Sequence, residues 1–251
     1  MAISVDRVYQ KVLAIANKEQ RGYITPQEFN LFADQAQMDI FEQYFYDLEQ
    51  RQRAPGNSFD YADIVSNIEE KISMFDIHDE SHTGVGGGVL NLSDLGGVMW
   101  RLGSVKVLYS TNPTFVGFAN VNKYREAEQV QQKEISQYLD SYLTNRFGGP
   151  YYTRYSTSGI PMIRIFPDSF DDVIISYIRK PNTPAWTYVI VDGTSASFNS
   201  GGGFIDFELH DSEENKLVVK ILQLAGVAIK DPALIQASTQ QEIKNVQQEK
   251  Q

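Results

Sequence analysis

The chain contains no cysteine, which excludes disulfide frameworks, thiolate zinc sites and cysteine nucleophiles together. Basic residues are also few: 22 Lys+Arg stand against 32 Asp+Glu, so the formal net charge is −10. An acidic balance of this size opposes a nucleic-acid interface built on phosphate neutralisation. Long apolar runs are missing as well, because Val173–Ile175 and Val189–Val191 fall far short of the roughly 18 residues of a membrane helix.

The first thirteen residues do not resemble a signal peptide. Apolar and polar side chains alternate there at helical spacing, and Asp6, Arg7 and Lys11 interrupt any apolar run. We therefore expect a soluble chain with no membrane partner, made inside the cell. An apolar content of 42% over 251 residues is enough for a sizeable core, which argues against wholesale disorder.

Helical patterns dominate residues 1–74. Apolar residues recur at i, i+3, i+4 and i+7 from Val5 to Ala16, with Gly22 as a plausible stop. Thr25-Pro26-Gln27-Glu28 has the threonine, proline and glutamate of a capping box, and the apolar face behind it continues to Leu48. The sequence predicts an N-terminal helical hairpin, followed by a weaker helix over 58–74.

Residues 75–211 are predicted to form a small antiparallel β domain with glycine-rich loops and one inserted helix over 122–143. Residues 98–102 and 105–109 indicate a hairpin around Gly103-Ser104. Segments 162–166 and 173–178 indicate two antiparallel strands, and Pro181 and Pro184 then take the chain out of the sheet. Further strands are expected over 186–191 and 204–209.

The last region, 212–251, is predicted to hold C-terminal helices and a tail. Ser212 with Glu213 and Glu214 places a cap and negative charge at a helix start. Asp231-Pro232 restarts a helix by the same logic, whereas the polar tail from Ser238 has few apolar anchors. The expected fold class is therefore α+β, in three regions: 1–74, 75–211 and 212–251.

Motifs that carry chemistry are weak throughout. The run Gly84–Gly88 suggests a phosphate loop, but no Gly-Lys-Ser/Thr follows it. The segment 21–29 has the glycine and glutamate of a calcium loop without its upstream acidic ligands, and the capping box explains Glu28. Asp168, Asp171 and Asp172 lie in a turn, where aspartate is common for backbone reasons.

The three histidines do not indicate a metal site or a catalytic base either. His78 and His82 are four residues apart beside two carboxylates, a spacing that binds a divalent ion only on a helix. The glycines that follow favour a solvated polar turn instead, and His210 has no neighbouring partner. We predict no catalytic residue, no metal site and no cofactor. The 14 tyrosines and 14 phenylalanines are read as core, with subunit interfaces as the alternative.

Three sets of segments resemble virion structural proteins of tailed bacteriophages: Ile3–Val12 and Tyr23–Asn30 at the N-terminus, Ile163–Pro167 with Val173–Pro181 in the middle, and Leu217–Val227 near the end. The resemblance covers most of the chain. It implies a head–tail connector protein: an adaptor or ring protein stacked below the portal, as in short-tailed and crAss-like phages.

The resemblance implies partners and a location as well. The chain would self-associate into a ring of about twelve-fold symmetry, contact the portal and other neck or tail proteins, and be assembled in the host cytoplasm into the neck of the virion. DNA would pass through without specific binding, in keeping with the acidic charge. The alternatives are another tail component, such as a tail-tube or fibre-anchoring protein, and a metal-assisted hydrolase using His78, His82 and His210.

Overall fold

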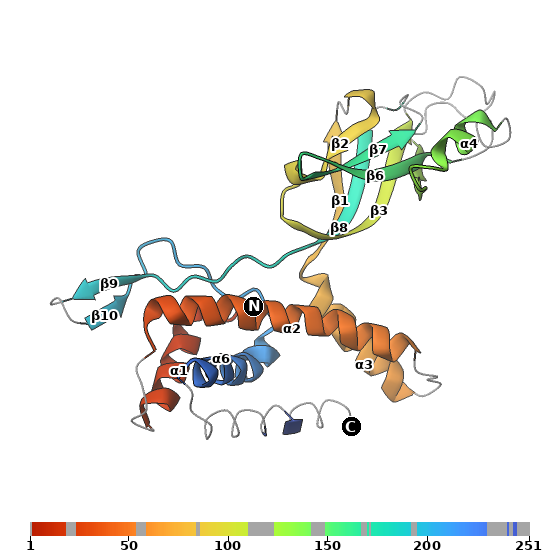
Figure 1. The fold of residues 1–251 in the computed structure, drawn as a ribbon. Coiled ribbons are helices and arrows are strands. Elements are labelled where there is room, and N and C mark those ends of the chain that lie inside the picture. The colour runs from red at the N-terminus through yellow and green to blue at the C-terminus, as the bar shows by residue number, and fades with distance from the viewer. Residues whose placement is uncertain are drawn as a thin grey trace. The chain divides into compact units, whose positions relative to one another are not determined.

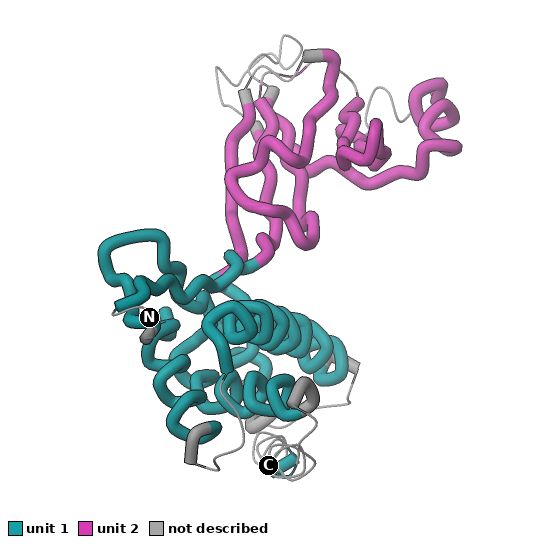
Figure 2. The backbone as a smooth tube through the Cα atoms, turned by 60° about the vertical axis from the view of Figure 1, so that its left-hand side comes forward, with its two compact units in different colours: residues 1–74, 181–251 teal, residues 75–180 magenta. Residues whose placement is uncertain are grey.

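The computed structural model describes residues 2–18, 24–53, 59–83, 86–109, 123–141, 149–166, 170, 172–191, 195–229, 240 and 243–244. The chain divides into two compact units, shown in Figure 2: unit 1 comprises Met1–Met74 and Pro181–Gln251, and unit 2 comprises Phe75–Lys180. The mixed α+β class is confirmed. The β unit ends at Lys180, however, rather than at the expected residue 211, so segment 181–211 belongs with the helices.

The helices of unit 1 whose bounds the structure describes are α1 (Val5–Lys18), α2 (Pro26–Arg53), α3 (Phe59–Ser73) and α6 (Glu214–Ile229) (Figure 1). The capping box at the start of α2 is present: the Thr25 N–H donates to Glu28 Oε2 at 2.9 Å, and the Glu28 N–H donates to Thr25 Oγ1 at 3.3 Å. Helix α6 packs against both α1 and α2, and α3 packs against α2. The predicted pairing of the first two helices is therefore not confirmed, because α6 is their main common neighbour.

Charged groups join the helices at the start of α6. Arg7 and Lys11 of α1 contact the Glu214 carboxylate at 2.6 and 2.7 Å. The neighbouring Glu213 is buried and accepts a hydrogen bond from Lys71 of α3. The positive end of the helix dipole also attracts these two carboxylates. The predicted acidic start of this helix is confirmed.

Unit 2 packs two four-stranded sheets face to face. One has the order β1-β8-β3-β4, from β1 (Asp76–Thr83), β3 (Met99–Tyr109), β4 (Lys123–Glu126) and β8 (Asp172–Arg179). The other has the order β2-β7-β6-β5, from β2 (Val89–Asn91), β5 (Glu128–Gln129), β6 (Tyr151–Thr157) and β7 (Ile160–Phe166). Both sheets contribute to one core, for example Val105 and Ile175 from the first and Ile163 and Ile165 from the second. All pairs are antiparallel except β5 with β6.

The predicted hairpin around Gly103-Ser104 is wrong, because β3 runs continuously through both residues. They form a bulge in which two residues of β3 oppose Ser176 of β8, between the pairs Leu102↔Tyr177 and Val105↔Ile175. Glycine is needed at 103, since an added Cβ would lie 2.8 Å from the Ser176 carbonyl oxygen. The glycine therefore marks a close approach of two strands, not a turn.

Two further expectations change. Segments 162–166 and 173–178 are strands, but they lie in different sheets: β7 pairs with β2 and β6, and β8 with β1 and β3. The helix expected over 122–143 is largely replaced by β4 and β5, leaving only the short α4 (Ile135–Asp140). Polar, glutamine-rich composition cannot distinguish an exposed helix from the edge strands of a sheet.

The prolines at 181 and 184 end the sheet as predicted, and the chain enters unit 1 there. Segment 204–209 is extended but makes only isolated bridges, Ile205 to Ala185 and Phe207 to Ile3. The helix expected after Asp231, the stop at Gly22, residues 84–85 and most of the turn at 167–172 lie outside the described residues. The rest of the glycine run forms the short 3-10 helix η1 (Gly86–Gly88). Within the described part of the chain, no helix has the length and apolar character required to cross a membrane.

Candidate functional site

The His78–His82 segment is a strand, not the solvated turn that the following glycines suggested. It forms most of β1, which pairs with β8 at the edge of its sheet. His78 Nε2 lies 3.2 Å from Asp76 Oδ2, and His82 Nε2 lies 3.4 Å from Glu80 Oε1. Each imidazole therefore faces one carboxylate. Across the described ranges, no group of three or more histidine or acidic side chains is placed to hold a metal ion.

His210 belongs to unit 1 and has a local role. Its Nδ1 accepts a hydrogen bond from the Ser212 N–H at 3.3 Å, which caps the short 3-10 helix η3 (Asp211–Glu213) immediately before α6. The cap was expected at Ser212, so the sequence placed it two residues too late. His210 lies in unit 1, whereas His78 and His82 lie in unit 2.

A cluster of hydrogen bonds in unit 2 surrounds Glu80. Its carboxylate accepts hydrogen bonds from the Tyr177 hydroxyl at 2.7 Å and from the Gly96 N–H at 2.9 Å, while the Gly97 N–H donates to the tyrosine oxygen at 3.2 Å. Burial, followed by the hydrogen bond to Glu80, raises the pKa of Tyr177 to about 12. The phenol therefore stays protonated at neutral pH, and this cluster fastens the Gly96-Gly97 loop to the sheet.

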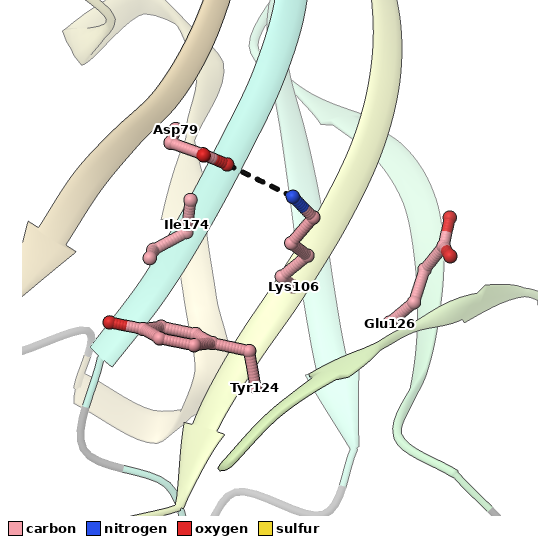
Figure 3. Close-up of a pocket in the computed structure, with 5 residues that line it drawn as sticks. All are labelled: Asp79, Lys106, Tyr124, Glu126 and Ile174. Carbon is pink, nitrogen blue, oxygen red and sulfur yellow. Dashed lines mark hydrogen bonds and ion pairs between the residues drawn. The ribbon is translucent and has the colours of Figure 1, made fainter. Parts of the chain in front are cut away.

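An open depression of about 550 Å³ lies on the β1-β8-β3-β4 sheet (Figure 3). Its lining is mixed: Lys106, Asp79, Tyr124, Glu126 and Ile174. Lys106 Nζ contacts Asp79 Oδ1 at 3.0 Å, so the cation of the lining is already neutralised. Asp79 has a left-handed backbone (φ 56°) at an irregularity in β1, which turns its carboxylate toward the lysine. The lining contains no nucleophile paired with a base.

The β9–β10 hairpin of unit 1 presents a run of apolar side chains to solvent. Strand β9 (Tyr188–Val191) pairs antiparallel with β10 (Ser195–Phe198) as a separate two-stranded sheet beyond the helices (Figure 1). Val189, Ile190 and Val191 are 51%, 63% and 44% exposed. Successive strand residues point to opposite faces, so both faces of β9 present apolar side chains to solvent. An unbroken apolar run is typical of a strand buried on both sides.

The base of this hairpin is held rigidly on α1 and α2. Trp186 is only 2% exposed; its ring centroid lies 4.1 Å from that of Tyr9, with the two rings tilted by 40°, and its indole N–H donates to Asp6 Oδ1 at 2.9 Å. The Asn30 amide bonds the Trp186 backbone twice, accepting from its N–H at 2.9 Å and donating to its carbonyl at 3.2 Å. Tyr188 and Phe198 of the hairpin stack on the indole.

A second amide of α2 holds the chain on both sides of the hairpin. Gln37 is fully buried; its Nε2 donates to the Asn182 carbonyl at 2.8 Å, and its Oε1 accepts from the Glu208 N–H at 3.1 Å. The Glu208 carboxylate in turn accepts from the Asn182 N–H and side-chain amide, both at 2.9 Å. Hydrogen bonds to α2 therefore hold the chain on both sides of the hairpin.

No known family model matches the chain, and no curated protein matches it significantly. Sequence reasoning predicted strand 186–191 but not its exposure, nor the anchoring role of Asn30 and Gln37. The sequence does contain a signal for this anchoring role. Asn30 and Gln37 are amides seven residues apart on one helical face, in line with buried alanines and phenylalanines.

Proposed function

We propose that the chain is a structural, non-enzymatic subunit of a phage head–tail connector, an adaptor or ring protein that stacks below the portal and forms part of the DNA conduit. The observation that carries the proposal is the β9–β10 hairpin, whose apolar side chains are exposed on both faces although its base is fixed. An apolar surface of this kind on a charged chain is typical of an interaction site.

Two other features agree with this role. The net charge of −10, repeated around a ring, gives a wall that repels the phosphate backbone, so DNA would pass without being held. The polar clusters of the described residues are used internally: Glu80 and Tyr177 fasten a loop, and His210 caps a helix. These arrangements are what a structural subunit needs, and they leave the exposed hairpin as the candidate contact with neighbours.

Quantitative mass spectrometry of purified virions tests the proposal. A connector subunit is expected in several copies per mature particle, in a fixed ratio to the portal protein. Absence from mature particles would refute it. A ratio that follows the tail-tube or fibre proteins instead would favour the alternative role in the tail. A monomeric state of the isolated chain does not decide between these roles, because connector subunits can assemble on the portal itself.

A further inference from the structure

We propose that the β9–β10 hairpin of one copy pairs edge to edge with the hairpin of the next copy, the outer edge of β9 lying beside the outer edge of β10. The inference rests on the proposed ring and names the contact that would join its subunits. It predicts a hydrogen-bonded contact between main chains, in addition to the burial of apolar side chains.

The edges of the hairpin are unprotected. In the part of the chain that the structure describes, β9 and β10 pair only with each other as a sheet. Natural edge strands usually carry lysine, proline or a bulge that prevents pairing with another chain. Neither β9 nor β10 contains lysine or proline, and their register from Tyr188↔Phe198 to Val191↔Ser195 has no irregularity. A two-stranded sheet is also marginally stable until further strands extend it.

Charge favours a second copy as the occupant. Two chains that each carry a net charge of −10 repel one another least where the surfaces that meet carry little charge. Between Trp186 and Ile205 the sequence holds a single charged residue, Asp192. A basic partner would gain nothing at such a surface and would bind an acidic one instead. The hairpin is therefore suited to contact between like-charged copies.

The antiparallel arrangement fixes how the contact repeats. If β9 lies beside β10 of the next copy, the new pair is again antiparallel, both edges of every hairpin are used, and the contact propagates head to tail until a ring closes. If β9 paired with β9 of a second copy, the contact would be two-fold and assembly through this edge would end at a dimer. The proposed ring requires the first arrangement.

Cross-linking tests this directly, because the chain has no native cysteine. Full-length V189C and I190C carry a cysteine on β9, and A196C and S197C carry one on β10. Residues paired across neighbouring strands have Cα atoms about 4.5–5.5 Å apart, which is within the range of a disulfide. Each β9 variant is mixed with each β10 variant, oxidised, and run on a non-reducing gel. Q10C, at an exposed position of α1, is the matched control.

We expect at least one mixture to give about tenfold more covalent dimer than either variant alone or Q10C. Dimer formed by a β9 variant alone would overturn the proposal in favour of two-fold pairing, and no excess in any mixture would overturn edge pairing altogether. V189K, introduced into the I190C variant, adds a second readout: the covalent dimer that I190C forms with a β10 variant should fall to the level of Q10C, with an unchanged melting temperature. If the copy number in virions stays high while no mixture cross-links, this inference fails and the proposed function stands; if the chain is absent from virions, the proposed function fails.

Discussion

Replacing Gln37 with leucine should destabilise unit 1 by about 2–4 kcal/mol. The wild-type amide is fully buried and bonds the Asn182 carbonyl and the Glu208 N–H, so Q37L removes both partners and leaves one donor and one acceptor of the main chain unsatisfied. Each unsatisfied main-chain group lowers the free energy of unfolding by about 1–3 kcal/mol. Burial of the leucine, and water that reaches the exposed Asn182, partly offset this loss.

The matched control is the same substitution two residues away. Gln35 is exposed on α2, so Q35L should change the free energy of unfolding by no more than about 0.5 kcal/mol. The chain has two tryptophans, Trp100 in unit 2 and Trp186 in unit 1. In a W100F background, Trp186 fluorescence during urea unfolding reports on the base of the hairpin alone. Equal effects of Q37L and Q35L would refute the claim that this amide holds segment 181–208 on α2.

Three further predictions concern the bulge, the buried tyrosine and the capping box. G103A should destabilise unit 2 by about 1–3 kcal/mol in chemical denaturation, since its methyl group would lie against the Ser176 carbonyl, whereas G202A, with open space around it, should be nearly neutral. The pKa of Tyr177 is raised in the folded state, so its contribution to stability is complete below pH 10 and is lost as the pH rises toward about 12; Y177F should flatten this part of the stability curve. Hydrogen bonds from the capping threonine lower the pKa of Glu28, so wild type should lose stability relative to E28Q as the pH falls below about 4.5, and parallel acid melts would contradict this.

Local signals in the sequence predicted the elements of the fold well where the physical cause is local. The Thr25–Glu28 capping box fixes the start of α2 because its bonds join residues three apart. The apolar periodicity of α1 and the proline exit after Lys180 depend likewise on near neighbours. These elements required no knowledge of tertiary contacts.

Where local signals did not predict the structure, contacts between residues far apart in the sequence determine it. Gly103-Ser104 has the composition of a turn, yet β8 supplies a partner about seventy residues away and holds β3 straight through the pair. Strands β7 and β8 follow one another in the sequence but do not pair, because each has its partners in a different sheet. The exposure of β9 could not be predicted from the sequence either. An apolar run indicates that a strand is buried, but it does not indicate whether the same chain or another molecule buries it.

We propose that copies of this chain form a ring at the neck of a phage particle. A three-dimensional image of the assembled virion, with this chain located in it, would show that ring or its absence. We expect a closed ring of copies below the portal, with the β9–β10 hairpins of neighbours side by side. A particle whose neck lacks the chain, or a single copy with its hairpins exposed to solvent, would contradict it.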